Sequence, residues 1–196
     1  MIGEIILDYK VERKIGSGGM ASVYKGIHVQ NNSPIAIKVL HRNFATNPLV
    51  RKRFVLEAEA LQKLTHPFVV KCIDFIDSDD NLILLLEYVE GIDLKKFLFK
   101  NPKFKQPKYA IPFFTKILEA IQHAHDNNLV HRDIKPTNIM VTPPKINPKI
   151  LDFGVVKSID NLDESLTGTS SIIGSRPYMS PEQIKSSKDV DHRTDI

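Results

Sequence analysis

One short polar string constrains this chain more than any other feature. It reads His131-Arg132-Asp133-Ile134-Lys135-Pro136-Thr137-Asn138 and lies between apolar segments. Asp133 offers a carboxylate that can accept a proton from an attacking hydroxyl. Lys135 offers positive charge for a transferring phosphoryl group, and Asn138 offers an amide oxygen suited to Mg²⁺. A random polar loop does not account for so many charged and coordinating groups, so the string predicts a catalytic loop.

A second acidic motif follows the apolar pair Ile150-Leu151. It reads Asp152-Phe153-Gly154, and its carboxylate at a strand end suits a Mg²⁺ ion that bridges phosphates. A plain Asp-x-Gly turn is the alternative interpretation.

The N-terminal part contains a glycine-rich turn, Gly16-Ser17-Gly18-Gly19, between two strand-like segments. Glycines allow the backbone to approach phosphates closely, although an ordinary hairpin turn is the alternative. A dinucleotide-binding fingerprint would lead into a helix, and a P-loop would end in Gly-Lys-Ser/Thr. Lys38 lies in an apolar strand and needs a partner, for which Glu57 on the next helix is the candidate. A lysine at a sheet edge with its ammonium in solvent is the alternative.

Periodicity predicts strands first and helices later. Alternating residues predict strands at 9–15, 21–29, 35–40, 69–76 and 82–88. A helix from Pro48 is expected to bury Phe54, Leu56, Ala58, Leu61 and Leu64. A longer helix at 109–125 is expected to bury Ile111, Phe114, Ile117, Leu118 and Ile121. Residues 158–175, rich in Ser, Thr, Asp and Gly, predict a long exposed loop. The pattern indicates a strand-rich lobe, a connector near 87–91 and a mainly helical lobe.

Composition restricts the setting. The 42% hydrophobic and 26% charged residues are ordinary for a globular protein, and a single cysteine excludes an internal disulfide. Cys72 has apolar neighbours, which predicts a buried thiol. The lysines from Lys95 to Lys108 are interpreted as a solvated surface, with an acidic or nucleic-acid partner as the alternative. We expect no nucleic acid, no membrane within this segment and a cytoplasmic location, and leave a membrane anchor beyond residue 196 open.

The ordered set of motifs resembles the eukaryotic-type (Hanks-type) serine/threonine protein kinases. The resemblance runs from Tyr9 to Asp195, and the wording of Phe54-x-x-Glu57-Ala58 and Ser180-Pro181-Glu182-Gln183 is closest to bacterial members. It implies an α+β bilobal fold, with a strand-rich N-lobe at 1–88 and a mainly helical, incomplete C-lobe at 89–196. The C-lobe would end at the start of its buried central helix.

The resemblance also implies roles for individual residues. Asp133 matches the catalytic base, Asn138 and Asp152 match the Mg²⁺ ligands (with Mn²⁺ as a possible substitute), and Lys135-Pro136 matches the serine/threonine type of loop. Lys38 matches the lysine that contacts the α- and β-phosphates, with Glu57 as its partner. An apolar column matches Leu61, Cys72, His131 and Phe153. The positions matched to ATP binding are Ile15, Gly16, Ser17, Gly18, Gly19, Val23, Ala36, Lys38, Leu86, Glu87, Val89, Asp93 and Met140.

The implied function is transfer of the γ-phosphate of Mg-ATP to serine or threonine hydroxyls of proteins. Arg132 implies regulation by phosphorylation of the following loop, at Thr167 or Thr169, by trans-autophosphorylation between self-associated chains. A nucleotide-binding pseudokinase or scaffold is the alternative, although Lys38, Asp133 and Asp152 are all present. Because the matched pattern stops early, we expect this length of chain to be weakly active.

Overall fold

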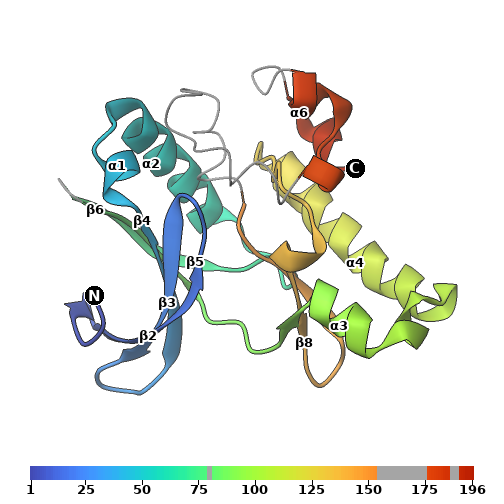
Figure 1. Ribbon diagram of the computed structural model, residues 1–196, viewed down its shortest axis with the longest axis horizontal. Coiled ribbons are helices and arrows are strands. Elements are labelled where there is room, and N and C mark those ends of the chain that lie inside the picture. Colours follow the sequence, from blue (N-terminus) through green and yellow to red (C-terminus); the bar gives the residue numbers. More distant parts are fainter. Residues whose placement is uncertain (79–80, 154–175, 186–189) are drawn as a thin grey trace.

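The computed structural model describes residues 1–78, 81–153, 176–185 and 190–196. A strand-rich lobe and a mainly helical lobe lie side by side, joined by the segment that follows β6 (Figure 1). The expected α+β architecture is therefore confirmed. Among the helices that the structure places, none has both the length and the apolarity needed to cross a membrane.

The small lobe is built on an antiparallel sheet with the strand order β1-β2-β3-β4-β6-β5. Four of the five strands predicted from alternation start within two residues of their expected position, whereas the strand predicted from Val69 starts at Cys72. The strands are β1 (Ile5–Ile6), β2 (Tyr9–Ser17), β3 (Ala21–His28), β4 (Pro34–Leu40), β5 (Cys72–Ser78) and β6 (Asn81–Glu87).

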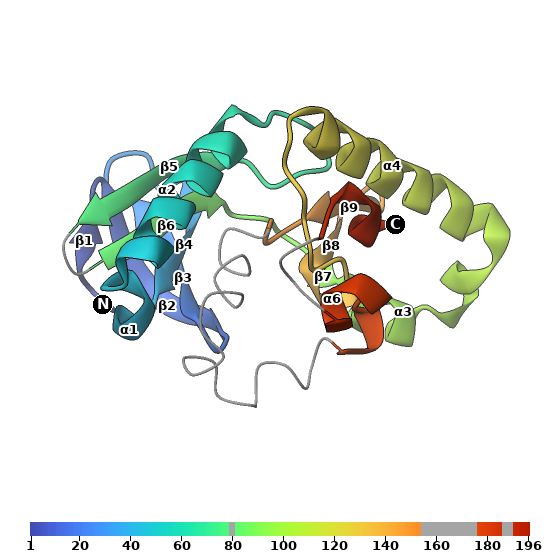
Figure 2. The same cartoon turned by 90° about the horizontal axis from the view of Figure 1, so that it is seen from above.

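Both faces of this sheet are covered, which explains why β6 reads as a continuous apolar run. Ile83 and Leu85 pack with residues of β2 and β4 on one face. Leu82, Leu84 and Leu86 belong to the larger core on the other face, because successive strand residues point to opposite sides. The larger core also contains α2, which crosses this second face (Figure 2).

Two helices connect β4 to β5: α1 (Arg42–Ala45) and α2 (Pro48–Lys63). The Asn47 side chain accepts from the backbone N–H groups of Leu49 and Val50, and Pro48 occupies the first helical turn, so α2 begins where a capped helix should. Phe54, Ala58, Leu61 and Leu64 are buried as expected, but the expectation for Leu56 is wrong. Its side chain is 57% exposed, since the buried stripe runs through Val50 at helical spacing.

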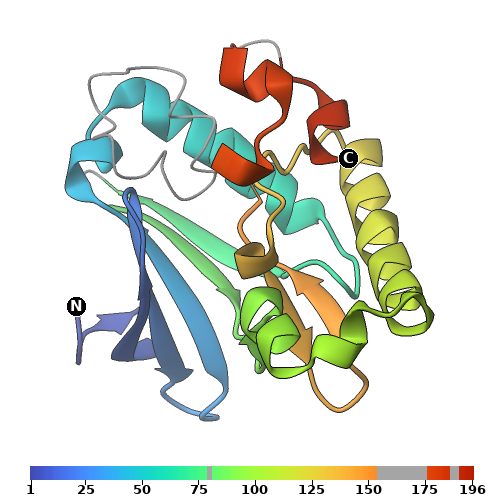
Figure 3. The same cartoon turned by 45° about the vertical axis from the view of Figure 1, so that its right-hand side comes forward.

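The large lobe combines helices with a three-stranded sheet of order β7-β8-β9. Figure 3 shows this small sheet between α3 and α4. The elements are β7 (Ile92–Asp93), α3 (Leu94–Lys100), η1 (Pro102–Lys105), α4 (Pro107–Asp126), η2 (Pro136–Asn138), β8 (Ile139–Thr142), β9 (Asn147–Ile150), η4 (Arg176–Tyr178), α6 (Pro181–Lys185) and η6 (His192–Asp195).

Helix α4 forms as predicted, but its buried stripe is different. Ile117 and Ile121 are buried as expected, whereas Ile111, Phe114 and Leu118 are exposed. The residues that face the lobe are Phe113, Ile117, Ala120, Ile121 and Ala124. Ala120 and Ala124 on the inner side allow close contact with β9, so a stripe chosen by side-chain size was wrong.

Candidate functional site

The catalytic loop predicted from sequence is held together by its own side chains. Lys135 Nζ lies 2.8 Å from Asp133 Oδ2, and Asn138 Nδ2 donates to the same oxygen at 2.9 Å and to the Asp133 carbonyl at 3.0 Å. The Asp133 side chain is only 10% exposed. These contacts keep an anionic carboxylate in one orientation, which is what a proton acceptor for a hydroxyl needs.

His131 is a structural residue of this loop. It is fully buried, and Nε2 lies 2.7 Å from the Leu151 carbonyl while Nδ1 accepts from the Asp133 backbone N–H at 3.2 Å. A carbonyl only accepts, so Nε2 carries the proton and the ring is neutral. Burial lowers the pKa of His131, in agreement with a neutral ring. Both ring nitrogens are used by the backbone, so His131 is not available as a base.

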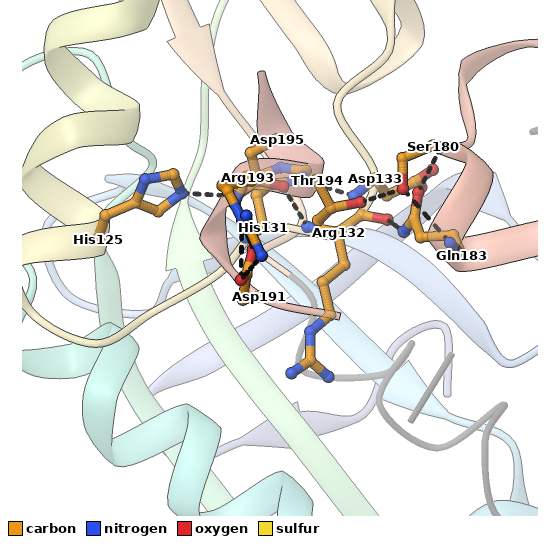
Figure 4. A network of polar contacts seen from close by, with 10 residues as sticks. All are labelled: His125, His131, Arg132, Asp133, Ser180, Gln183, Asp191, Arg193, Thr194 and Asp195. Carbon is orange, nitrogen blue, oxygen red and sulfur yellow. Dashed lines mark hydrogen bonds and ion pairs between the residues drawn. The ribbon is translucent and has the colours of Figure 1, made fainter. Parts of the chain in front are cut away.

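Asp195 fixes the backbone of the predicted catalytic loop (Figure 4). Its carboxylate accepts from the N–H groups of His131 and Arg132, both at 2.7 Å, and lies 2.8 Å from His125 Nε2. Arg132 has a φ of 62°, a conformation that is strained for a residue with a side chain. The two contacts of Asp195 with backbone N–H groups stabilise that strained turn immediately before Asp133.

A second contact reaches the same turn from α6. Gln183 Nε2 donates to the Arg132 carbonyl at 2.9 Å, and Ser180 Oγ lies 2.7 Å from Thr194 Oγ1 (Figure 4). Gln183 and Asp195 belong to the sequence motifs described above, but the motifs did not indicate these contacts. They depend on tertiary packing between segments about 50–60 residues apart, for which local sequence carries no signal.

Lys38 and Asp152 are brought together from the two lobes. Lys38 Nζ donates to Asp152 Oδ1 at 2.7 Å. Partial burial disfavours the charged form of Asp152, but the charge and hydrogen bond of Lys38 outweigh it and the pKa of this carboxyl lies below its ordinary value. In this structure the ion pair of Lys38 is therefore with Asp152 rather than with Glu57, which lies half-buried on α2.

The residues expected around a nucleotide lie on one face of the small-lobe sheet. Val23 is opposite Lys38 in the β3–β4 pair, and Ala36 is opposite Leu86 in the β4–β6 pair. Because cross-strand partners and alternate residues of a strand share a face, all four side chains point to the same side. Ile15 lies at an irregularity in the β2–β3 register and is 39% exposed.

The glycine-rich turn is held in place by His41, a residue that the sequence motifs did not indicate. His41, just after β4, donates its backbone N–H to the Met20 carbonyl at 2.8 Å. Its Nδ1 lies 3.1 Å from the Gly19 carbonyl and its Nε2 lies 3.2 Å from Ser22 Oγ. Within the turn, Gly18 donates to the Ala21 carbonyl at 2.8 Å. His41 therefore links the tip of the turn to the strand that carries Lys38.

In the connecting segment, the acidic side chains form an ion pair and a helix cap. Glu87 Oε2 lies 2.8 Å from Lys149 Nζ, and this pair lines a pocket with Phe68 and Val89. The Asp93 carboxylate accepts from the Lys96 N–H at 2.9 Å, and thereby caps α3. Partial burial opposes ionisation of Asp93, but its contacts with Lys96 hold the pKa below the ordinary value. Asp93, one of the positions matched to ATP binding, thus caps a helix in this structure; Met140 lies opposite it on β8.

Asn138 and Asp152 have the chemistry that a Mg²⁺ ion requires. The Asn138 amide nitrogen is used by Asp133, which leaves its side-chain oxygen as the group available to a cation. The Leu151 N–H donates to the Asn138 carbonyl at 2.8 Å, so Asn138 lies beside the segment that carries Asp152. Mg²⁺ is commonly held by one or two protein oxygens together with substrate phosphates, and these two residues fit that pattern.

The apolar column expected between the lobes is present. Leu61, Cys72 and Phe153 are buried in one core cluster, and the His131 and Phe153 rings meet edge to face with centroids 4.8 Å apart. Burial raises the pKa of the Cys72 thiol to about 11, as expected for a structural cysteine. The column connects α2 and β5 of the small lobe to the catalytic loop. Thr167 and Thr169, the expected phosphorylation sites, lie outside the described residues.

Comparisons with known proteins agree with this geometry. A sequence profile described as the protein kinase domain matches residues 9–196. Serine/threonine-protein kinase PrkC of Bacillus subtilis is 38% identical over 177 residues, covering 90% of this chain and 27% of that protein. The kinase pkn3 of Myxococcus xanthus is 35% identical over 198 residues, covering 98% of this chain and 36% of that protein. The chain therefore spans well under half the length of these relatives.

Solved structures show the same fold. The PknI kinase domain of Mycobacterium tuberculosis superimposes with a TM-score of 0.76 at 28% identity, over 100% of this chain and 72% of that one. The expected bilobal fold, with a strand-rich first lobe, is confirmed by this match.

Proposed function

This chain belongs to the protein kinase family, and on that premise we propose that it transfers the γ-phosphate of Mg-ATP to serine or threonine hydroxyls of protein substrates. The observation that carries the proposal is the arrangement of the Asp133 carboxylate. Lys135 and Asn138 hold it at 2.8 Å and 2.9 Å, and the backbone beneath it is fixed by Asp195.

In the proposed reaction Asp133 accepts the proton of the substrate hydroxyl. Lys135, next to that carboxylate, neutralises charge on the transferring phosphoryl group and orients it toward the hydroxyl. The neutral, fully bonded His131 serves only to shape the loop. Asn138 and Asp152 would hold Mg²⁺, or Mn²⁺ in its place, and the bound ion would neutralise phosphate charge.

The nucleotide would be held mainly by the small lobe. We assign the adenine to the face that carries Val23, Ala36 and Leu86, and the phosphates to Lys38 and the glycine-rich turn. Lys38 must leave Asp152 for the phosphates, and Glu57 on α2 would then position its ammonium. Val89 and the backbone of Glu87 would bind the adenine edge.

The resemblance to serine/threonine kinases also supports control by phosphorylation. Arg132 precedes Asp133, and a phosphate on Thr167 or Thr169 would pair with a guanidinium at that position. Self-association would allow one chain to phosphorylate another. We propose a cytoplasmic location for this reaction.

Radiolabelled phosphate transfer tests the function directly. The chain is incubated with Mg²⁺ and γ-labelled ATP, alone and with a generic protein substrate. We expect label on serine or threonine, and its loss in Asp133→Asn with little change in nucleotide affinity. An exposed-site variant, Asp8→Asn, is the control. Nucleotide binding without any transfer would reject the proposal and favour the scaffold alternative.

A further inference from the structure

One segment of the large lobe carries an unusually one-sided charge. Residues 94–118 contain no aspartate or glutamate, and the net charge of the whole chain is only +4. The segment therefore holds more positive charge than the whole chain does, and the rest of the chain is net negative. Its positive residues are all lysines, at Lys95, Lys96, Lys100, Lys103, Lys105, Lys108 and Lys116.

The fold places six of these lysines on consecutive elements of the large lobe. They lie on α3, η1 and the first turn of α4, and all six are exposed. In Figures 1 and 2, α3 lies in the large lobe near β8, and the chain runs from it to the start of α4 at the end farthest from the small lobe. We use the name basic platform for a set of exposed residues: Lys95, Lys96, Phe99, Lys100, Lys103, Lys105 and Lys108.

An aromatic cluster under the basic platform makes it a single surface. The Phe104 ring, from η1, meets Phe97 of α3 at 4.9 Å and Phe113 of α4 at 5.3 Å between centroids, edge to face in both cases. These rings pack inward against one another and hold α3, η1 and α4 together. The lysines on the outside are therefore carried by one packed unit, in which Lys96 also pairs with Asp93 at 2.9 Å.

Phe99 is the apolar member of the basic platform. It is 89% exposed, and it lies one helical turn after Lys95 and next to Lys100 on the solvent side of α3. Leu94, Phe97 and Leu98 occupy the inner side of the same helix. A large aromatic ring surrounded by cations has the composition of a helix that lies in a lipid–water interface.

We propose that the basic platform binds the surface of a bilayer that contains anionic phospholipids, with Phe99 inserted at the headgroup level. Lysines supply point charges that suit the diffuse negative potential of such a surface. Recognition of nucleic-acid phosphates favours the planar guanidinium of arginine, and residues 94–118 contain none. Bases would need several aromatic rings for stacking, whereas the exposed rings next to these lysines are Phe99 and Tyr109.

This attachment replaces the expectation of a merely solvated lysine surface, and it is independent of the proposed kinase activity. The basic platform begins directly after Asp93, at the end of the segment that joins the lobes. A bilayer at the basic platform would leave Lys38 and the glycine-rich turn accessible to nucleotide. The protein would therefore meet substrates that lie at the same surface.

Vesicle co-sedimentation tests the charge contribution. The protein is mixed with vesicles of phosphatidylcholine alone or with added phosphatidylglycerol, at low and high salt. A variant with Lys95→Gln, Lys100→Gln and Lys103→Gln is compared with one that carries Lys10→Gln, Lys52→Gln and Lys63→Gln, since both lose the same charge at exposed sites.

We expect salt-sensitive binding to the acidic vesicles only. At about fivefold for each lysine near an acidic bilayer, the first variant should bind roughly 100-fold more weakly. The control variant should lose much less. Equal binding to neutral vesicles, equal losses in the two variants, or tighter binding to single-stranded DNA or polyglutamate than to acidic vesicles would overturn the proposal.

Fluorescence tests the position of Phe99. The chain contains no tryptophan, so Phe99→Trp introduces a single reporter at the basic platform. Its emission should shift to shorter wavelength when acidic vesicles are added, and Leu56→Trp at an exposed position of the small lobe should not respond. A matching response from both reporters, or none from Trp at position 99 while the protein binds, would exclude insertion of this side chain.

Discussion

Lys38 Nζ donates to Asp152 Oδ1 at 2.7 Å, across the junction of the two lobes. One partner is the proposed phosphate-binding lysine and the other is a proposed magnesium ligand. The contact therefore links the two lobes and brings these two proposed roles to one place.

The first prediction concerns the pH dependence of this ion pair. Asp152→Asn should lower the free energy of unfolding at neutral pH by no more than about 1 kcal/mol, because the Asp152 side chain is 42% exposed and the pair is screened. The folded-state pKa lies below the ordinary value, so the unfolded chain binds the proton more readily. The stabilisation is thus fully present above about pH 3.9 and is lost as pH falls through the folded-state pKa.

Urea denaturation at several pH values measures this effect. The difference between the wild type and Asp152→Asn should shrink toward acid, while Asp8→Asn, at an exposed position, should show no such trend. A difference that grows as the pH falls would contradict the assigned direction of the pKa shift.

The second prediction concerns His41. His41→Phe removes the contacts to the Gly19 carbonyl and to Ser22, so the tip of the glycine-rich turn should lose its anchor. With about 1 kcal/mol for each lost hydrogen bond, we expect KM for ATP to rise by about fivefold or more with kcat little changed. His28→Phe, on the neighbouring β3, is the matched control. A fall in kcat with KM unchanged would show that His41 does not act through the turn.

The third prediction concerns Asp195. Asp195→Ala leaves the buried N–H groups of His131 and Arg132 without their acceptor, at about 1–3 kcal/mol for each group. We expect a loss of stability together with a fall in kcat of roughly 100-fold or more, because the turn before Asp133 is no longer fixed. Asp195→Asn keeps one acceptor oxygen and should retain part of both. His192→Ala, at an exposed neighbour, should change neither quantity.

Sequence patterns predicted the elements well and their long-range contacts poorly. The strands of the small lobe could be predicted because alternation and turns are local features. The polar string at 131–138 could be singled out because burying charged residues between apolar segments costs free energy unless they have partners or a function. By contrast, the choice between Glu57 and Asp152 as partner of Lys38 depends on how α2 sits against the sheet. The same limit applies to Asp195 and His131, which are 64 residues apart.

Burial on helices failed for a related reason. Leu56 and Leu118 were expected inside because they are large and apolar, yet both are more than half exposed. Which side of a helix is buried depends on what packs against it, and small residues such as Ala120 and Ala124 allow the closest approach. Hydrophobic size alone does not identify that side.

The last prediction separates glycines needed for folding from glycines needed for ligand approach. A Cβ at Gly91 would lie 2.3 Å from the Val141 carbonyl oxygen, and the φ of Gly91 is 151°. Gly91→Ala should therefore destabilise the fold by about 2 kcal/mol or more. At Gly16 and Gly18 the nearest atom would be 3.8 Å away, so alanine fits the chain itself and should leave stability equal or slightly higher.

If phosphates approach this turn, those two tolerated alanines should still weaken nucleotide binding, because the space they fill is the space that the ligand needs. Thermal unfolding and ATP titration of Gly16→Ala, Gly18→Ala and Gly91→Ala measure both quantities on the same samples. Stable Gly16→Ala and Gly18→Ala variants with unchanged ATP affinity would show that the turn is an ordinary hairpin. Lower ATP affinity with unchanged stability would identify the glycines as ligand-facing, since folding alone does not require them.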